Sequence, residues 1–320
     1  MSLYLGVDGG GSKTAFLLLD DTGRIIAEAQ TASCYYFTTG IELVGRILTQ
    51  GVAEVGARAG ISPSDIDRAF FGLPGYGEVS ADMGRLDAVP GEVHGHGRYS
   101  CDNDMVCGWA GSLGAEDGIN VISGTGSMTY GELDGRGHRV GGWSELFGDE
   151  GSAYWIAARG LNAFTRMSDG RLARGPLYDS IRTRTGVTSD LDVIDVVMNG
   201  WQGRRGAIAD LSKTVVEASA AGDLVAAQIL RDACDELVGI VDATRIELGF
   251  PDDGRVPVSY SGGMFTADPI RSGFEDALLA RPCGYELRSP MFGPAVGAAL
   301  YAAKQTGTPL SESALARLRS

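Results

Sequence analysis

The residues of this chain that could do chemistry begin with an aspartate beside a glycine-rich loop. Asp8 lies directly before three consecutive glycines in the segment Gly6–Thr14, which reads GVDGGGSKT. Glycine amides can approach a phosphate closely because no Cβ atom stands in the way. A carboxylate at the same place would repel the phosphate unless a divalent cation, usually Mg²⁺ held partly through water, lies between them. The segment therefore indicates a phosphate site with Asp8 as a candidate metal-binding residue.

The loop matches neither of the two common phosphate-binding patterns that are rich in glycine. A Walker A loop has a glycine directly before its lysine, whereas Ser12 precedes Lys13 here. The dinucleotide pattern G-x-G-x-x-G would need a glycine in place of Thr14 and a helix after it. The apolar run Ala15–Leu19 (AFLLL) instead predicts a strand that ends in a turn. We therefore expect a hairpin turn between two strands, with or without a bound anion.

A weaker copy of the glycine loop occurs farther along the chain. The segment Val7–Thr14 (VDGGGSKT) aligns with Ile122–Thr129 (ISGTGSMT) at one constant offset, and a strand, a turn and another strand follow each copy. This shared layout favours an internal duplication over two unrelated hairpins, and it predicts two domains with related cores. The first copy alone carries an acid, because Asp8 corresponds to Ser123. That asymmetry fits one metal ion held from one side.

Two further acids stand where a predicted strand gives way to a helix. The strand includes Tyr99–Cys101 and the helix starts at Met105, so Asp102 and Asp104 both fall at the junction. In a strand both side chains would point to the same face, because the side-chain period is two. Position alone therefore leaves both acids open as candidates for a chemical role.

Apolar periodicity and turn residues predict the elements that must position these loops and acids. Three strands joined by tight turns predict an antiparallel meander at the N-terminus, and the region between Ala153 and Leu248 is mostly helical. Asp223 is a natural N-cap for the last of these helices. The predicted strands are Tyr4–Val7, Ala15–Leu19, Arg24–Ala29, Ala69–Leu73 and Val256–Tyr260, and the predicted helices include Ile41–Gly60, Ala207–Ala221, Asp223–Leu248 and Pro294–Lys304.

Composition limits the partners of the chain. Its 320 residues carry a net charge of −14, and such a surface repels nucleic acid and anionic membranes. The five cysteines form no C-x-x-C pair and are expected to be reduced thiols, and no apolar run is long enough to span a bilayer. His94 and His96 are expected in a solvated loop rather than in a metal site. We therefore expect a cytoplasmic protein that binds small molecules, with no nucleic acid and no membrane as partner.

Five segments in order resemble the BadF/BadG/BcrA/BcrD ATPase family, which belongs to the sugar kinase, Hsp70 and actin superfamily. Within the family the resemblance is greatest to the N-acetylglucosamine kinases. It implies an α/β fold of two ribonuclease-H-like (actin-like ATPase) domains around a cleft, and we expect a homodimer. The N-terminal lobe would span residues 1–112 plus 295–320, and the C-terminal lobe would span residues 113–294 with a helical insertion. The five segments are GVDGGGSKT (Gly6–Thr14), FGLPGYGE (Phe71–Glu78), ISGTGS (Ile122–Ser127), GDEGSAYWIA (Gly148–Ala157) and SGGMF (Ser261–Phe265).

The resemblance also implies roles for individual residues. Asp104 aligns with the catalytic acid of the family, which takes a proton from a sugar hydroxyl, and Asp102 is its rival. Asp8 would hold Mg²⁺. The ATP site would comprise Gly10, Gly11, Ser12, Lys13, Thr125, Gly262 and Gly263. The sugar site would comprise Asp104, Ser127, Gly142, Asp149, Trp143 and Tyr35. For Asp149 the alternative is a charge at a helix N-terminus, and for Trp143 the alternative is packing.

The resemblance implies an ATP- and Mg²⁺-dependent sugar kinase that converts N-acetylglucosamine to its 6-phosphate. One departure from the family pattern bears on the sugar, because Tyr35 stands where the family usually has a sugar-contacting asparagine. Another hexosamine or a hexose is therefore an alternative substrate. Two other classes remain open: an ATPase that activates a dehydratase, and a non-catalytic protein that binds a sugar or a nucleotide.

Overall fold

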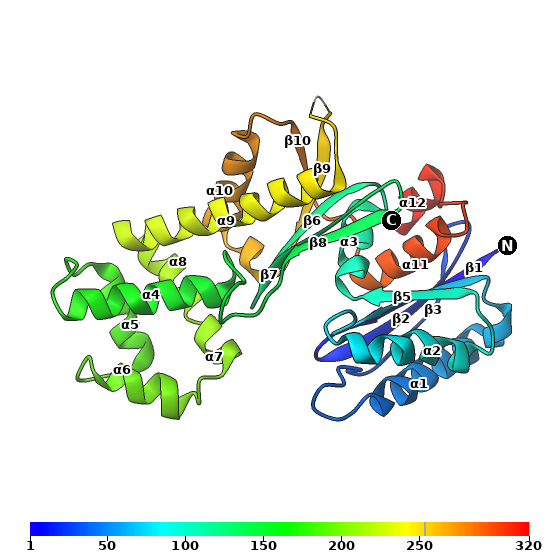
Figure 1. Ribbon diagram of the computed structural model, residues 1–320, viewed down its shortest axis with the longest axis horizontal. Helices are drawn as coiled ribbons and strands as arrows, with labels where there is room; N and C mark the ends of the chain where they lie inside the picture. Colours follow the sequence, from blue (N-terminus) through cyan, green and yellow to red (C-terminus); the bar gives the residue numbers. More distant parts are fainter. Residues whose placement is uncertain (253, 320) are drawn as a thin grey trace. The chain divides into compact units, whose positions relative to one another are not determined.

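The computed structural model of the chain describes residues 1–252 and 254–319, and the contacts between them divide into two units (Figure 1). The first unit comprises Met1–Asp117 and Ser289–Ser320, and the second comprises Gly118–Arg288. Each unit is built on one mixed five-stranded sheet with helices packed against it, which confirms the predicted α/β class.

The two sheets have the same strand order and the same strand directions. The first has the order β5-β4-β1-β2-β3 and the second has the order β10-β9-β6-β7-β8. In each sheet the first three strands of the unit form an antiparallel meander. The fourth strand pairs in parallel with the first, and the fifth pairs in parallel with the fourth. This repetition is what the predicted duplication requires. The strands are β1 (Leu3–Gly9), β2 (Lys13–Asp20), β3 (Ile25–Ala32), β4 (Arg68–Leu73), β5 (Tyr99–Asn103), β6 (Gly118–Ser123), β7 (Ser127–Leu133), β8 (Arg136–Gly141), β9 (Val256–Ser261) and β10 (Tyr285–Arg288).

Helices cover both faces of the first sheet, which explains why β1 is almost wholly buried. Leu5 and Val7 pack in one apolar cluster with Val44 and Leu48 of α1. Gly6 faces the other side, where a Cβ atom would lie 2.3 Å from a backbone atom of α11, so only glycine permits this approach. The helices of the first unit are α1 (Glu42–Ala59), α2 (Met83–His94), α3 (Met105–Leu113), α11 (Pro294–Lys304) and α12 (Glu312–Leu318), with short 3₁₀ turns η1 (Pro63–Asp65) and η2 (Ser80–Asp82).

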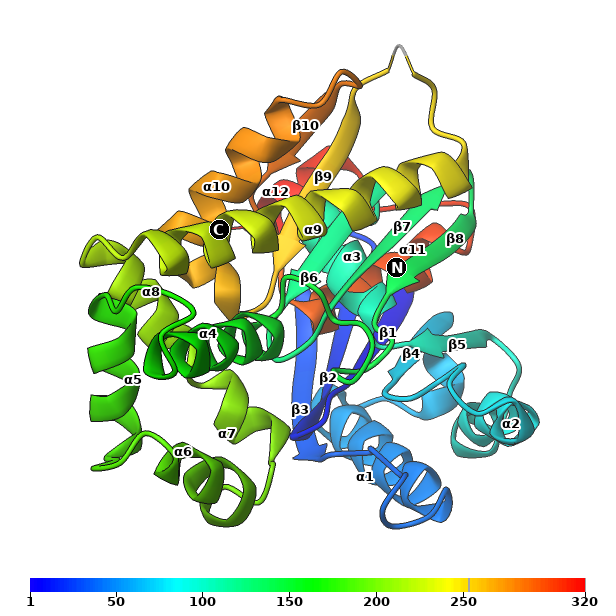
Figure 2. The same cartoon turned by 60° about the vertical axis from the view of Figure 1, so that its left-hand side comes forward.

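The second unit carries a helical region between its strands β8 and β9. The longest helix, α9, contacts β6, β7 and β8 (Figure 2). It begins at the predicted cap, where the Asp223 carboxylate accepts hydrogen bonds from the amides of Val225 and Ala226. The helix predicted over Ala207–Ala221 is in fact two helices, α7 and α8. The helices of this region are α4 (Ala153–Ser168), α5 (Pro176–Thr185), α6 (Asp192–Asp195), the π-helical η3 (Val196–Gly200), α7 (Arg205–Ala209), α8 (Ser212–Ala220) and α9 (Leu224–Leu248), and η4 (Gly263–Thr266) and α10 (Asp268–Leu279) follow β9.

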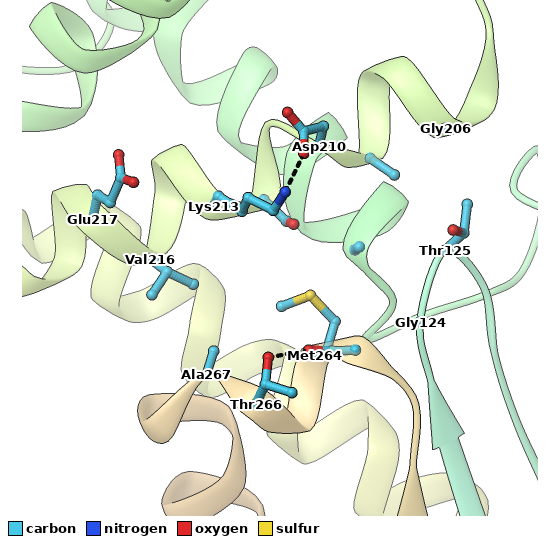
Figure 3. Close-up of a pocket in the computed structure, with 14 residues that line it drawn as sticks. Gly124, Thr125, Gly206, Asp210, Lys213, Val216, Glu217, Met264, Thr266 and Ala267 are labelled. Atoms are coloured by element: carbon cyan, nitrogen blue, oxygen red, sulfur yellow. Dashed lines mark hydrogen bonds and ion pairs between the residues drawn. The ribbon is translucent and has the colours of Figure 1, made fainter.

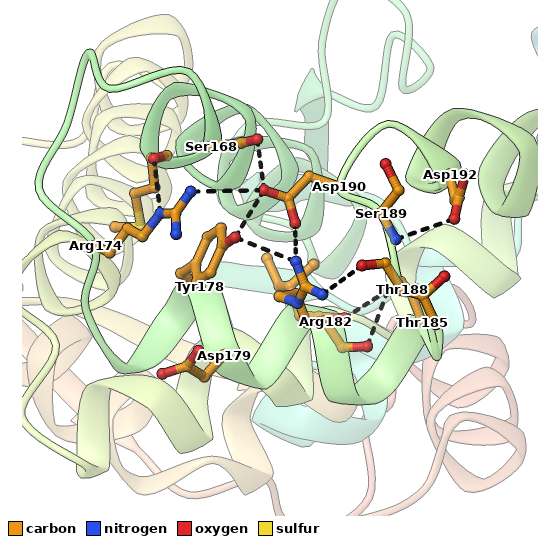
Figure 4. Close-up of polar contacts among 12 residues, drawn as sticks. Ser168, Arg174, Tyr178, Asp179, Arg182, Thr185, Thr188, Ser189, Asp190 and Asp192 are labelled. Atoms are coloured by element: carbon orange, nitrogen blue, oxygen red, sulfur yellow. Dashed lines mark hydrogen bonds and ion pairs between the residues drawn. The ribbon is translucent and has the colours of Figure 1, made fainter.

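A polar cluster around Asp190 fixes the outer part of this helical region (Figure 4). The Asp190 carboxylate accepts hydrogen bonds from the hydroxyls of Ser168 and Tyr178, at 2.7 Å each, and pairs with the Arg182 guanidinium. Arg174 lies over the Tyr178 ring at 4.4 Å from its centroid. The Asp190 carboxylate therefore links the end of α4 to α5.

Within the described ranges 1–252 and 254–319, no helix combines the length and the apolar character needed to cross a bilayer.

Candidate functional site

The first glycine loop is a hairpin turn, as the sequence predicts. Gly9 at the end of β1 pairs with Thr14 on β2, and the Gly10 amide donates a hydrogen bond to the Lys13 carbonyl at 2.8 Å. The Ser33 hydroxyl donates to the Gly10 carbonyl at 2.7 Å, which fixes the shape of the turn from outside. Gly11 and Ser12 are exposed at its tip, and no atom lies within 4 Å of a Cβ position at Gly11. The tip is thus free to approach an anion.

Asp8 lies beside this turn at the carboxyl end of β1, where it pairs with Gly72 on β4. Burial raises the pKa of Asp8 to about 6, and the positive charge of Lys13 partly opposes that rise. The Lys13 ammonium itself donates a hydrogen bond to Gln30 at 3.2 Å. Burial disfavours the ionised form of a carboxyl group, and a cation beside it stabilises that form.

A magnesium ion fits this carboxylate in one particular way. Among the described residues, no three histidine, cysteine, aspartate or glutamate side chains are grouped so that they could share a metal ion. Mg²⁺ commonly uses one or two carboxylates and completes its shell with water and substrate phosphates. Asp8 beside the open tip of the first hairpin suits that kind of binding rather than a closed protein cage.

Asp104 occupies the junction between β5 and α3. The strand ends at Asn103 and Asp104 is the N-cap residue of the helix, but its side chain makes no capping hydrogen bond. The Asn103 side chain holds the junction instead, since it accepts from the Met105 amide at 3.2 Å and donates to the Tyr76 carbonyl at 3.0 Å. Asp104 is therefore placed by its neighbours and is not committed to capping its own helix.

The surroundings of Asp104 move its titration toward neutral pH. Burial is the main cause and the negative charge of Asp8 adds to it, so the pKa of Asp104 is about 7. Asp102 belongs to the strand itself and accepts a hydrogen bond from the Asn103 amide at 2.7 Å. The two acids therefore do not share one strand face, because Asp104 already lies in the turn that starts the helix.

Gly72 makes room for this arrangement, although its place in the segment Phe71–Glu78 does not by itself indicate that role. A Cβ atom at Gly72 would lie 2.2 Å from the Cys107 sulfur and 3.1 Å from the Asp104 Cα atom. Gly72 pairs with Asp8 on one side and with Asp102 on the other. The absence of a side chain at Gly72 allows the backbone at the end of β5 to lie close to the ends of β4 and β1.

Tyr35 lies in the segment after β3, with Phe37 close by. Both rings are more than a third exposed and meet edge to face at 5.1 Å between centroids. Tyr36 between them is buried and its hydroxyl donates to Asp82 at 3.0 Å. Only alternate members of the aromatic run Tyr35–Phe37 are therefore available to a ligand.

The second glycine loop is also a hairpin, but its turn is one residue shorter than that of the first loop. Ser123 pairs with Ser127, and the Gly124 amide donates to the Gly126 carbonyl at 2.9 Å. The first hairpin encloses Gly10–Lys13, whereas the second encloses Gly124–Gly126. The two loops therefore share a place in the fold without sharing an identical turn.

Ser127 and Gly142 are brought together behind the second loop. Ser127 is buried, its hydroxyl donates to the Glu150 carbonyl at 2.6 Å, and its own carbonyl accepts from the Gly142 amide at 3.0 Å. Gly142 has a φ of 72°, which favours glycine at this position. These contacts place Ser127 beside Gly142. Gly142 is followed directly by Trp143, which is 67% exposed.

Asp149 has a more enclosed setting than its predicted role suggests. Its side chain is 3% exposed and forms an ion pair with Arg205 at the start of α7. Burial raises the pKa of Asp149 above its ordinary value, while Arg205 and the Ser127 amide pull it down. Asp149 precedes α4 at Ala153, but the N-cap of that helix is Ser152, whose hydroxyl accepts from the Trp155 amide. Its strongest partner is thus Arg205, which the sequence reasoning did not find.

A cavity of about 580 Å³ opens beside the second loop, within the second unit (Figure 3). Thr125 and Gly263, both predicted for the ATP site, lie on its wall. Gly262 is not among the lining residues, and a Cβ atom there would lie 2.3 Å from the Ser123 carbonyl oxygen. Gly263 leaves space for a ligand, whereas Gly262 permits a backbone contact.

Most of the remaining cavity wall comes from residues of α7, α8 and η4 that the sequence did not predict for a ligand site. Val216 and Met264 supply apolar surface, and Lys213 and Glu217 supply charge from α8. The Lys213 ammonium pairs with Asp210 at 2.5 Å, where α7 ends (Figure 3). An apolar slot with a few charged groups at its edge is typical of a small-molecule site. The feature that could have indicated this cavity is the break between α7 and α8 at Asp210, which apolar periodicity alone does not show.

The comparisons with known proteins agree with each other. A sequence profile of the BadF/BadG/BcrA/BcrD ATPase family matches residues 5–302. The N-acetylmuramic acid/N-acetylglucosamine kinase of Clostridium acetobutylicum is 29% identical over 82% of this chain and 86% of its own length. The N-acetyl-D-glucosamine kinase of Dictyostelium discoideum is 26% identical over 94% of this chain and 97% of its own length. A crystal structure of a proposed N-acetylglucosamine kinase from Chromobacterium violaceum is 26% identical, has a TM-score of 0.65 and covers 94% of this chain and 98% of that one.

Proposed function

Because the chain belongs to the BadF/BadG/BcrA/BcrD ATPase family, we propose that it is an ATP-dependent kinase of an amino sugar, with N-acetylglucosamine as the leading substrate and O6 as the acceptor. The relatives that match along most of the chain are kinases of N-acetylated amino sugars. The observation in the structure that carries the proposal is Asp104. It combines a strand-end position, a side chain that does not cap its helix and a pKa of about 7.

Phosphoryl transfer asks a protein mainly for positioning and for stabilisation of charge. In the proposed reaction, Asp104 accepts a hydrogen bond from the attacking sugar hydroxyl and takes its proton. The bond from the sugar oxygen to the γ-phosphorus of ATP forms as the bond from that phosphorus to the bridging oxygen breaks, and ADP leaves. A carboxylate with a pKa near 7 is a stronger base than an ordinary aspartate and is still largely ionised at slightly alkaline pH. Asp102 remains the alternative base.

The ATP site that we propose follows the predicted residues. The hairpin tips with Gly11, Ser12 and Thr125 would contact phosphate oxygens through backbone amides. Gly10, whose amide donates to the Lys13 carbonyl, would shape the first tip. The cavity beside Gly263 suits an adenosine group, since Val216 and Met264 offer apolar surface and Glu217 offers a hydrogen-bond acceptor. When bound, Mg²⁺ would neutralise phosphate charge, and Asp8 is the residue of this chain that would hold it. Lys13 would add positive charge near Asp8.

The sugar site that we propose comprises Ser127, Gly142 and Asp149, with Trp143 and Tyr35 as exposed rings that can stack on a pyranose. Arg205 and the Ser127 amide already occupy part of the Asp149 carboxylate. Sugar hydroxyls would donate to its remaining lone pairs. Tyr35 replaces an amide side chain of the family pattern. A hexosamine without the N-acetyl group and an unmodified hexose are therefore the rival substrates.

Two further parts of the proposal concern the setting of the enzyme. The five free cysteines support a reducing, cytoplasmic location, where ATP is available. A homodimer is the assembly that we propose, and the molar mass in solution from light scattering tests it.

The experiment that tests the function is a coupled assay of ADP release with a panel of sugars. We expect Mg²⁺-dependent ADP release with N-acetylglucosamine, and lower or no release with glucosamine, N-acetylmuramic acid and glucose. Mass spectrometry of the product should show one added phosphate. Release that no sugar stimulates would overturn the kinase proposal, and stimulation by a different sugar alone would overturn the substrate while keeping the reaction class.

A further inference from the structure

Arg205 reaches from the helical region to the segment 142–149, which contains three residues proposed to bind the sugar. Arg205 is the first residue of α7, and its guanidinium pairs with the buried carboxylate of Asp149. Its Nε atom lies 3.3 Å from a carboxylate oxygen of Glu145. One arginine thus contacts two acids that lie four positions apart in one irregular segment.

This segment has a backbone that needs outside support. Ser144 and Asp149 both have a positive φ, at 81° and 57°, although neither is glycine, and Gly142 has one at 72°. Non-glycine residues in this region cost free energy and persist where surrounding contacts hold them. The segment is also exposed at Trp143, Leu146 and Phe147, so apolar burial does not fix it there. Polar contacts such as those of Arg205 must supply much of the restraint.

The guanidinium also lies against the second glycine loop. A Cβ atom at Gly126 would lie 2.3 Å from an Arg205 nitrogen and 2.7 Å from an Asp149 oxygen. The absence of a side chain at Gly126 is therefore what allows the pair to form at this place. The next residue, Gly206, lines the cavity that we propose for the nucleotide, but the Arg205 side chain itself is directed to the acids.

We propose that Arg205 is a positioning residue for sugar binding: it holds Asp149 ionised and fixed, and it fastens the segment 142–149 through Glu145. The inference rests on the proposed function, because Arg205 is assigned to hold Asp149, the proposed acceptor for sugar hydroxyls. Arg205 contacts neither reactant in this scheme, and acts through Asp149.

The electrostatics of the pair give the expected consequence of losing Arg205. The charged groups that act on Asp149 are Arg205, which favours its ionised form, and Glu145 and Glu150, which oppose it. Without the guanidinium, burial and two like charges act on the carboxylate unopposed except by the Ser127 amide. Asp149 then takes up a proton as the pH falls and becomes a poorer acceptor for sugar hydroxyls.

The test compares the Michaelis constants of Arg205→Gln, Arg205→Lys and a matched control, Arg204→Gln, with those of the wild type. Arg204 is the exposed neighbour, and its side chain donates to the Trp201 carbonyl at 3.2 Å. For Arg205→Gln we expect the sugar KM to rise about 10- to 100-fold at pH 7, the size of a lost hydrogen bond to a charged group. The ATP KM and the control should change by less than about twofold.

Two readouts separate positioning from a general structural role. The sugar KM of Arg205→Gln should rise further as the pH is lowered from 8 to 6, with a steeper slope than that of the wild type. In an Asp149→Asn background, Arg205→Gln should raise the sugar KM by a smaller factor than in the wild type, because only the contact of Arg205 with Glu145 remains to be lost. Arg205→Lys, which keeps the charge but loses the fork between two acids, should fall between wild type and Arg205→Gln.

Three results would overturn the inference. These are an unchanged sugar KM in Arg205→Gln, an equal rise in the sugar and ATP constants, and an undiminished effect in the Asp149→Asn background. If Arg205→Gln does not fold, Arg205→Lys provides the test. A sugar KM of Arg205→Lys equal to that of the wild type would then contradict the inference. An active wild type with a normal Arg205→Gln refutes this inference alone, whereas a wild type that phosphorylates no sugar refutes the proposed function.

Discussion

Asp8 and Asp104 stand at the ends of two strands that flank β4, and the negative charge of Asp8 helps to raise the pKa of Asp104 to about 7. Gly72 occupies β4 at the level of Asp8 and leaves the space in which the Asp104 backbone lies. Two like charges that share a buried region favour protonation of one of them. A cation held at Asp8 would reduce this repulsion, so the arrangement ties the basicity of Asp104 to the state of Asp8.

Replacement of the proposed base is the most direct prediction. We expect Asp104→Asn to lower kcat by about 10²- to 10⁴-fold, the range for loss of a positioned general base. Sugar binding should be partly kept, because the amide still offers an oxygen to the hydroxyl. Turnover numbers and the sugar affinity from titration calorimetry check this. Asp102→Asn is the matched variant, and a larger loss in Asp102→Asn than in Asp104→Asn would move the role to Asp102.

The same substitution should stabilise the folded protein, by an amount that depends on pH. Asp104 has an ordinary pKa of 3.8 and a folded pKa of about 7, so the folded state binds the proton more tightly. Stability contributed by this group is therefore present below pH 3.8 and is lost as the pH rises through 7. Asp104→Asn avoids that loss, so its Tm should exceed that of the wild type by a few degrees at pH 8.

The pH dependence of this gain checks its cause. The difference in Tm between Asp104→Asn and wild type should shrink as the pH is lowered from 8 to 5, as the carboxyl group takes up its proton. Scanning calorimetry without Mg²⁺ or ATP gives the measurement. A difference that stays constant over this range would show that titration of Asp104 does not cause it.

Asp8→Asn should weaken the response to Mg²⁺. If Asp8 holds the ion, the Mg²⁺ concentration for half-maximal rate should rise by at least about tenfold, as for disturbed metal sites in general. Rates measured at fixed ATP over a range of Mg²⁺ concentrations test this. Lys13→Gln serves as comparison, because Lys13 acts on Asp8 only through charge. An unchanged Mg²⁺ requirement in Asp8→Asn would remove Asp8 from the metal site.

Much of the fold follows from local signals in the sequence. Short apolar runs and tight glycine turns predict the meander of the first unit, and Asp223 caps α9 as its residue type suggests. The glycine repeat indicates the second sheet, whose strand order is that of the first. These features depend on neighbours in the chain, and such neighbours are visible in a single sequence.

The site was less predictable because its partners are far apart in the chain. Nothing in the spacing of Asp149 and Arg205 indicates their ion pair, and the helical periodicity of Ala207–Ala221 hides the break at Asp210 that shapes the cavity. The expectation of a solvated loop is wrong for His94, which is the last residue of α2 and is 4% exposed. Such features arise from tertiary packing, which local patterns do not encode.

The buried position of His94 predicts a loss of stability in acid. Its ring lies 5.3 Å from the Phe71 ring and stacks on His96, and burial lowers the pKa of His94 to about 4. The unfolded chain takes up a proton near pH 6.5 while the folded protein does not, so stability falls as the pH drops from 6.5 toward 4. His94→Phe should reduce this loss. A Tm that declines equally in both proteins between pH 7.5 and 5 would contradict the assignment.

The two adjacent glycines at the end of β9 should respond to substitution in opposite ways. Gly262 has a φ of 98°, and a Cβ atom there would lie 2.3 Å from the Ser123 carbonyl oxygen, so Gly262→Ala should lower the Tm by several degrees. Gly263 lines the cavity and has no atom within 4 Å of its Cβ position, so Gly263→Val should leave the Tm nearly unchanged. It should raise the ATP KM about tenfold, the change that a loss of about 1.4 kcal/mol in binding produces. Because the valine fills space that the adenosine group would use, an unaltered ATP KM in a folded Gly263→Val protein would place the nucleotide elsewhere.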